Sequence, residues 1–202
     1  MKLLILFLGL FFVGQDIQAQ TEKGRLAIGG NASTGIWQLN TAERNSRQLM
    51  PNVGLFVRDN ILIGVGGSLQ RINTKFPKPE LLGNLNSIQG TAIGLSLFVR
   101  RYLLKNRFKP FVHFDASYNS STSRFSYTQG LPDKSVEGHY YSASVGLGAG
   151  YFVSKRLSID ATATLGIASL ESAFKYRELD PSNRLLLLGI GANWYLSPKA
   201  KK

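Results

Sequence analysis

The sequence predicts an all-β fold, an eight-stranded antiparallel up-and-down transmembrane β-barrel. Large apolar residues alternate with small or polar ones along most of the chain, which is the pattern of strands with two different faces. After the first segment, no apolar run approaches the length of a membrane-spanning helix. Segments with this alternation are joined by connections that are short and long in turn, as in outer-membrane barrels.

The N-terminal segment has the pattern of a secretory signal peptide. Lys2 precedes an apolar run from Leu3 to Val13, and the small residue Ala19 precedes the expected cleavage site. The run is shorter than the roughly 20 residues of a spanning helix, which disfavours an N-terminal membrane anchor. We therefore expect a signal peptide over residues 1–19 and one barrel domain over residues 20–202. The chain has no cysteine, which excludes disulfides, a lipid-modified cysteine and thiolate metal sites.

The alternation is clearest between residues 141 and 153. One face carries Tyr141, Ala143, Val145, Leu147, Ala149, Tyr151 and Val153, and the other carries Ser142, Ser144, Gly146, Gly148, Gly150 and Phe152. A soluble sandwich would turn its bulky face inward and long charged side chains outward, but here the face with the small residues has few charges. We therefore expect the bulky face to contact lipid and the small residues to line a narrow lumen.

Eight segments are expected to form the strands. They lie near residues 24–33, 47–57, 61–73, 88–101, 109–121, 138–153, 156–170 and 183–196. The short connections (58–60, 103–108 and 154–155) are expected to be periplasmic turns, and the polar regions around 34–46, 74–87, 122–137 and 171–182 to be extracellular loops. An even number of strands places both termini at the periplasmic end.

A short pattern recurs where every second predicted strand ends: LFVR at 55–58 and 97–100, YFVS at 151–154 and WYLS at 194–197. Strand parity turns one ring of each copy inward, namely Phe56, Phe98, Phe152 and Tyr195. We hypothesise that these rings plug the periplasmic end of the lumen, although ordinary packing of a narrow barrel is an equally good interpretation. The same pattern turns Tyr151 and Trp194 outward as interface aromatics, and Tyr102 lies beside that boundary.

The formal net charge of +12 raises the question of nucleic-acid binding. The basic residues gather at the short-turn end, as Arg58, Arg100, Arg101, Lys105, Arg107, Lys109, Lys155, Arg156, Lys199, Lys201 and Lys202. The long loops mix both signs, and no basic groove with interleaved aromatics is present. This placement predicts a basic rim that contacts phospholipid phosphates and predicts no nucleic-acid partner.

Several of the residues that strand parity places on the lumen-facing side are polar. His113, Asp115 and Ser117 share this face, and Asp160 is a further buried carboxylate. A histidine oriented by a carboxylate can act as a base, but same-face neighbours on one strand are about 7 Å apart, which predicts no direct bond between His113 and Asp115. A polar network satisfied within the lumen is the favoured interpretation.

Some eight-stranded barrels are lipid A-modifying enzymes with a histidine and a serine at the outer rim. His139 is expected there, but Ser142 has the opposite parity. No nucleophile elbow, phosphate loop or carboxylate cluster occurs, and we expect no catalytic residue, metal or cofactor.

Two segments carry a family resemblance. The hairpin GAGYFVSKRLSI (148–159) and the terminal strand GIGANWYL (189–196), with the Ala-Gln at 19–20, resemble Bacteroidetes-type outer-membrane β-barrel proteins. These porin-family or outer membrane protein β-barrel domain proteins are similar in shape to OmpX, OmpW and the OmpA membrane domain. The resemblance implies assembly by the barrel assembly machinery, which recognises the last strand; here residues 197–202 follow that strand. It implies no substrate and no functional residue.

These patterns predict a non-enzymatic integral outer-membrane protein with a structural or surface-interaction role through its long loops. An eight-stranded barrel holds little more than its own side chains, which disfavours a general porin. A narrow channel or lateral conduit for small or hydrophobic molecules is the first alternative, and a lipid A-modifying enzyme is the second. We expect a monomer that contacts outer-membrane lipids, with an extracellular partner that the sequence does not identify.

Overall fold

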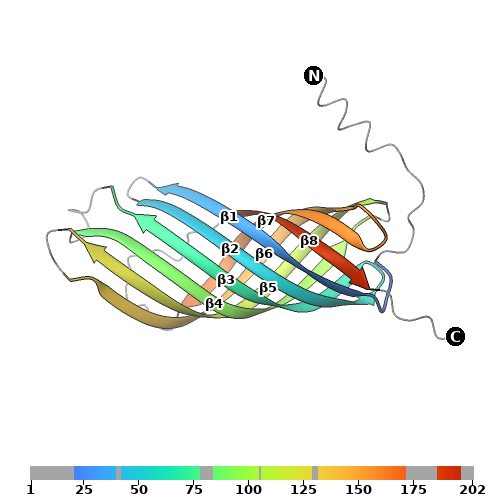
Figure 1. The fold of residues 1–202 in the computed structure, drawn as a ribbon, viewed down its shortest axis with the longest axis horizontal. Coiled ribbons are helices and arrows are strands. Elements are labelled where there is room, and N and C mark those ends of the chain that lie inside the picture. Colours follow the sequence, from blue (N-terminus) through green and yellow to red (C-terminus); the bar gives the residue numbers. More distant parts are fainter. Residues whose placement is uncertain are drawn as a thin grey trace, which may run out of the picture.

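The computed structural model describes residues 21–39, 42–77, 84–104, 106–128, 132–171 and 186–196. In this part of the chain, antiparallel strands form one closed barrel in which β8 returns to pair with β1 (Figure 1). The strands are β1 (Leu26–Leu39), β2 (Ala42–Arg58), β3 (Ile61–Lys75), β4 (Leu85–Tyr102), β5 (Phe108–Tyr127), β6 (Lys134–Phe152), β7 (Leu157–Glu171) and β8 (Leu186–Leu196). The predicted fold class is confirmed. The expected signal peptide lies outside the described residues.

The strands run further than the sequence predicts at the end opposite the short turns. β1 continues to Leu39 and β2 begins at Ala42, so most of the loop expected at 34–46 is a paired hairpin. β5 likewise reaches Tyr127, and β6 begins at Lys134. The prediction was wrong here because the extensions have no consistently apolar face, which is the pattern that identifies a lipid-facing strand. Because a spanning strand needs only about 9–11 residues, the barrel extends well beyond the hydrocarbon layer at this end.

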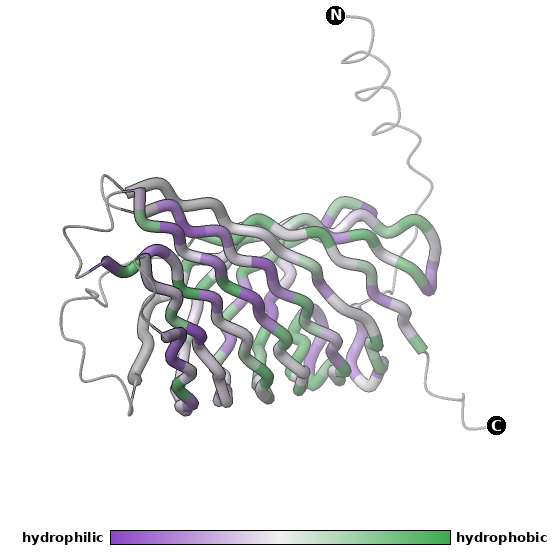
Figure 2. The backbone as a smooth tube through the Cα atoms, turned by 60° about the vertical axis from the view of Figure 1, so that its left-hand side comes forward, coloured by the Kyte–Doolittle hydropathy of each residue, from purple (hydrophilic) through white to green (hydrophobic). Residues whose placement is uncertain are grey.

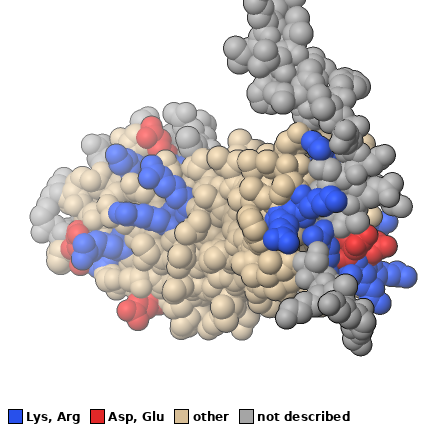
Figure 3. Space-filling view, turned by 45° about the vertical axis from the view of Figure 1, so that its right-hand side comes forward, with Lys and Arg blue, Asp and Glu red and all other residues tan. Residues whose placement is uncertain are grey.

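The outward face of the barrel is apolar through its middle. Its most exposed members include Leu95, Leu97, Leu147 and Ile190, each at least 65% exposed. Figure 3 shows charged side chains toward the two ends of the barrel and an uncharged zone between them. Exposed large apolar side chains on so many strands are rare in soluble monomers but match the lipid-facing belt of a membrane barrel. Among the described residues, no helix is both long and apolar enough to cross a membrane.

The inward face carries small and polar residues, and hydropathy alternates along the strands (Figure 2). Leu26 of β1 is the register partner of Leu196 of β8, so the chain enters and leaves the barrel at one end. The connections β2–β3, β4–β5 and β6–β7 lie at this same end. The buried core is concentrated there rather than spread along the lumen. This end of the lumen therefore holds the candidate site.

Candidate functional site

A cluster of rings fills the short-turn end of the lumen, and we call it the aromatic plug: Phe56, Tyr102, Phe111, Phe152 and Tyr195. Each of these side chains is at most 2% exposed. Tyr102 is the central member, with its ring centroid 6.0 Å from that of Phe56, 5.4 Å from that of Phe111 and 6.4 Å from that of Phe152. The ring centroid of Tyr195 lies 5.1 Å from that of Phe152 and 6.1 Å from that of Phe56. The rings come from β2, β4, β5, β6 and β8, so together they cross the barrel.

The four rings expected in the lumen, Phe56, Phe98, Phe152 and Tyr195, are all buried in one apolar cluster. The ring centroid of Phe98 lies 5.8 Å from that of His113, so Phe98 also contacts the polar part of the lumen. The placement of Tyr102 at the membrane interface is wrong, because its side chain is 2% exposed and points inward. Strand parity could have identified Tyr102 as lumen-facing, since it lies four positions after Phe98 on the same face of β4. Phe111 lies on the same face of β5 as His113, so parity could have identified it as lumen-facing too.

A buried ion pair lies against the plug. Nη1 of Arg100 lies 2.5 Å from Oδ2 of Asp160, and the two side chains reach across the lumen from β4 and β7. Asp160 also accepts hydrogen bonds from Nδ2 of Asn193 at 2.6 Å and from Oγ of Ser158 at 2.8 Å. A carboxylate with several donors is well compensated for the loss of water. The ion pair therefore connects β4 to β7 through the lumen.

The ion pair and the plug form one continuous structure. The guanidinium of Arg100 lies 4.1 Å from the ring centroid of Phe111, in cation–π geometry, and donates to the hydroxyl of Tyr102 at 3.3 Å. The hydroxyls of Tyr102 and Tyr195 lie 3.3 Å apart. The placement of Arg100 and Lys109 in an exposed basic rim is wrong, because both are buried. Charge alone suggested the rim, whereas strand parity turns both side chains inward. Arg58, Arg101, Lys155 and Arg156 are exposed at this end.

The chain segment before β1 covers the mouth of the barrel beneath the plug. Thr21 is 4% exposed, and its Oγ1 accepts a hydrogen bond from Nζ of Lys109 at 3.1 Å. The backbone N–H of Asn60 donates to the carbonyl of Thr21 at 2.7 Å, and the N–H of Gly24 donates to the carbonyl of Phe56 at 2.7 Å. These contacts come from an N-terminal segment that the sequence analysis did not assign to the site. They add a second layer of closure at the same end.

Further toward the long connections, polar side chains continue to bridge the lumen. Nδ2 of Asn31 on β1 donates to Oγ1 of Thr162 on β7 at 3.0 Å. The hydroxyl of Tyr140 on β6 donates to Oε1 of Gln70 on β3 at 2.9 Å. These strands are not neighbours in the sheet, so the bonds pass through the interior. The lumen is thus crossed at more than one position along its axis.

His113 and Asp115 face the lumen from β5, as parity predicts. The expectation that they make no direct contact is wrong, because Nε2 of His113 lies 3.3 Å from Oδ2 of Asp115. The two side chains lean toward each other along the strand, which shortens the separation set by the backbone. Ser144 Oγ donates to the same Asp115 oxygen. No contact links this group to Asp160, so the three predicted network residues form two separate clusters within the described part of the chain.

The arrangement does not resemble a hydrolytic site. Ser144 bonds to Asp115 rather than to His113, so His113 does not activate this serine. His139 is exposed and stacks on Tyr118 outside the barrel, with ring centroids 5.8 Å apart, whereas Ser142 bonds to Ser117 inside. Among the residues that the structure describes, no group of three potential metal ligands is found.

Of the other predicted interface aromatics, Trp194 is outward and exposed, and Tyr151 is half-buried. The sequence analysis missed an aromatic pair nearer the opposite border of the belt. Tyr118 and Tyr141 are exposed register partners with ring centroids 4.9 Å apart. Their alternation could have identified them, because both lie on outward positions of long strands.

Two glycines make room for rings in the lumen. A Cβ at Gly148 would collide with the ring of Phe111, and a Cβ at Gly64 would lie 2.5 Å from Cζ of Phe98. We predict that Gly148→Ala lowers the free energy of unfolding by about 1–3 kcal/mol, because the ring has to move within a packed lumen. Urea unfolding of refolded protein in micelles measures this effect. Gly166→Ala is the matched control, since nothing lies within 4 Å of its Cβ position. Equal stability of the two variants would contradict the close packing.

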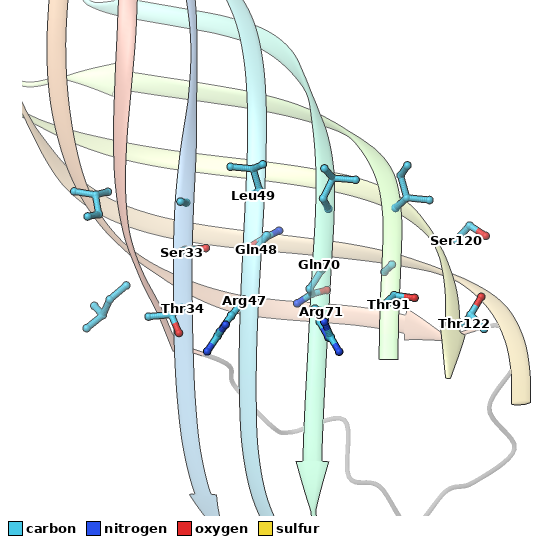
Figure 4. Close-up of a pocket in the computed structure, with 16 residues that line it drawn as sticks. Ser33, Thr34, Arg47, Gln48, Leu49, Gln70, Arg71, Thr91, Ser120 and Thr122 are labelled. Carbon is cyan, nitrogen blue, oxygen red and sulfur yellow. The ribbon is translucent and has the colours of Figure 1, made fainter. Parts of the chain in front are cut away.

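A pocket of about 980 Å³ lies toward the long connections, away from the plug (Figure 4). Residues of β8 and of β1 to β5 line it, with Ser33, Gln48 and Gln70 on lumen-facing positions and Arg47 and Arg71 on outward-facing ones. None of the plug residues contributes to its lining. The pocket and the plug therefore occupy opposite halves of the barrel.

The comparison of sequences places the chain in a family. Residues 87–198, more than half of the chain, match the model of DUF3575, described as a protein of unknown function. The chain belongs to the DUF3575 family. No curated protein matches its sequence.

The solved structures to which this chain is similar include barrels of outer-membrane proteins. A major outer membrane protein from Thermus thermophilus is 11% identical, with 86% of this chain and 99% of that chain covered and a TM-score of 0.57. OprG from Pseudomonas aeruginosa is 13% identical, with 91% and 100% covered and a TM-score of 0.52. The N-terminal barrel domain of OprF from the same organism is 11% identical, with 86% and 98% covered and a TM-score of 0.50. At these identities the likeness shows the fold, which is the one predicted for an outer-membrane location.

Proposed function

We propose that this DUF3575 protein is a non-enzymatic, monomeric outer-membrane barrel with a closed lumen, which acts through the surface that it presents outside the membrane. The observation that carries this proposal is the closure of the short-turn end. The aromatic plug, the Arg100–Asp160 ion pair and the segment around Thr21 all block the lumen at this end. A solute would have to displace all three to pass, which favours a structural or surface role over conduction.

The long strands support a role outside the membrane. β5 has 20 residues and β6 has 19, roughly twice the number that a spanning strand needs. The surplus lies at the end with the long connections and carries polar side chains. It would hold the loops away from the lipid surface as a rigid collar. Insertion by the barrel assembly machinery fits a protein of this kind and is part of the proposal.

Planar-bilayer recordings of the refolded protein without the expected signal peptide (residues 20–202) test the closed lumen. We predict no steady current, because the buried rings and the ion pair leave no continuous aqueous path. Folding of the same sample is checked by its changed mobility on unheated gels. A stable single-channel current from folded protein would contradict the proposal. It would favour the second candidate, a narrow conduit that uses the pocket of about 980 Å³ as its outer vestibule.

Deletion of the gene separates a structural role from an enzymatic one. A structural barrel predicts greater sensitivity of the cells to detergents and an unchanged mass spectrum of lipid A. A shift in lipid A mass that the intact gene reverses would instead show lipid-modifying chemistry.

A further inference from the structure

We propose that Arg47 and Arg71 form a binding site for the phosphate of a lipid headgroup, on the outer wall of the barrel where the apolar belt ends. The two arginines are exposed register partners on β2 and β3, and their parity turns both outward. Cross-strand partners have Cβ atoms about 5 Å apart, and two like charges at this spacing destabilise a sheet. An anion between them would remove this repulsion.

The described protein supplies no such anion. Neither arginine has an acidic partner within salt-bridge distance among the described residues. Glu43 lies on the same face of β2, but four positions away, at roughly 13 Å along the strand, and its register partner is Lys75. The other register partners of the pair are Thr34 on β1 and Thr91 on β4, which carry hydroxyl groups and no charge. The pair is therefore a local excess of positive charge with hydroxyls on both sides.

The depth of the pair identifies its ligand as a lipid. One step toward the belt, Leu49 and Leu69 are register partners and both are exposed, and Val53 and Val65 repeat this arrangement further along. At about 3.3 Å per residue and a tilt of about 40°, the stretch from Arg47 to Arg58 rises roughly 28 Å along the barrel axis. This is close to the ~25 Å apolar band of outer-membrane barrels. Arg47 and Arg71 thus lie at the headgroup border on the side of the long connections.

Guanidinium groups fit this ligand. Arginine presents several N–H donors in one plane and binds phosphate through two bonds at once. Two adjacent guanidinium groups can therefore hold one phosphate, while the apolar column below them contacts its acyl chains. A phosphorylated lipid supplies both parts, whereas a soluble anion supplies only the first. The proposal rests on the membrane location of the barrel but not on a closed lumen, so bilayer conductance does not decide it.

The test compares lipid binding by three proteins refolded in detergent micelles: the unaltered chain, Arg47→Gln with Arg71→Gln, and Lys75→Gln with Arg124→Gln. The last is a matched control, because it removes the same charge from exposed residues on β3 and β5, which are not paired with each other and lie further from the belt. The probes are bisphosphorylated lipid A and the same glycolipid without phosphates, followed by native mass spectrometry. We expect the Arg47/Arg71 variant to bind the bisphosphorylated probe roughly tenfold more weakly or worse, with the control close to the unaltered chain.

A stability measurement guards against a trivial folding defect. With the phosphate-free probe, the Arg47/Arg71 variant should be at least as stable to heat as the unaltered chain, because the repulsion between the arginines is gone. With the bisphosphorylated probe, the unaltered chain should gain stability and the variant should not. Equal binding of both glycolipids, or an equal loss in the control variant, would overturn the proposal. Full competition by millimolar inorganic phosphate would show an anion site that is not specific for lipid, which also overturns it.

Discussion

Asp160→Asn should lower the free energy of unfolding by about 3–5 kcal/mol, because it leaves the buried guanidinium of Arg100 without a counter-charge. The substitution keeps the size of the side chain, so the loss reports charge and hydrogen bonding rather than a cavity. Arg100 is 5% exposed and Asp160 1% exposed, so water cannot replace the missing partner. Urea titration of refolded protein, followed by tryptophan fluorescence and by gel mobility, measures the effect.

Asp133→Asn makes the same chemical change at an exposed site near the long connections and should alter stability by less than about 1 kcal/mol. The double variant Arg100→Met with Asp160→Asn should recover part of the loss, because neither position of the former ion pair then carries a charge. If Asp160→Asn were as stable as Asp133→Asn, the ion pair across the lumen would not be an important contact. The assignment of this end as a closed barrier would then depend on the rings and on the segment around Thr21.

Tyr102→Ala should destabilise the barrel by a similar amount, about 3–5 kcal/mol, because it removes the ring that contacts three other members of the plug. It also removes a hydroxyl that accepts a hydrogen bond from Arg100 and lies 3.3 Å from the hydroxyl of Tyr195. The cavity would lie where the walls are already joined by large side chains and cannot move closer. Urea titration under the same conditions measures the change.

Tyr118→Ala is the control for Tyr102→Ala. Tyr118 is 45% exposed on the outer face, and its loss should cost less than about 1.5 kcal/mol from its contact with Tyr141. The comparison also separates the inward position of Tyr102 from the interface position that the sequence suggested. Similar small losses in both variants would favour the interface position and contradict the plug.

Side-chain alternation made most of the barrel predictable. A strand turns successive side chains to opposite faces, so Phe56, Phe152 and Tyr195 could be placed in the lumen without any tertiary information. The same rule fails where neither face is consistently apolar, which is why the sequence predicts a loop around 34–46 although most of these residues form a paired hairpin. Side-chain alternation also places Arg100 and Tyr102 on the lumen-facing side of their strand. The charge of Arg100 and the position of Tyr102 near a turn nevertheless suggested exposed positions.

The sequence alone could not predict which side chains contact each other across the lumen. Strand parity predicts that Arg100 and Asp160 both point inward, but it does not predict that they form an ion pair. That contact depends on the tilt of the strands and the closure of the sheet. The contact between His113 and Asp115 depends on side-chain rotation, which strand spacing does not set. The cover formed by Thr21 depends on where a short non-strand segment folds back.

By itself, the sequence determined an eight-stranded membrane barrel with a bulky lipid-facing side, a small-residue lumen and rings near its short-turn end. These features follow from local backbone geometry, which repeats every two residues. Only the tertiary structure decided that the rings, the Arg100–Asp160 pair and the N-terminal segment close the same end, and that Arg47 meets Arg71 at the border of the belt. Those contacts join residues that are far apart in the chain, and the register and shear of the closed sheet determine which of them come together.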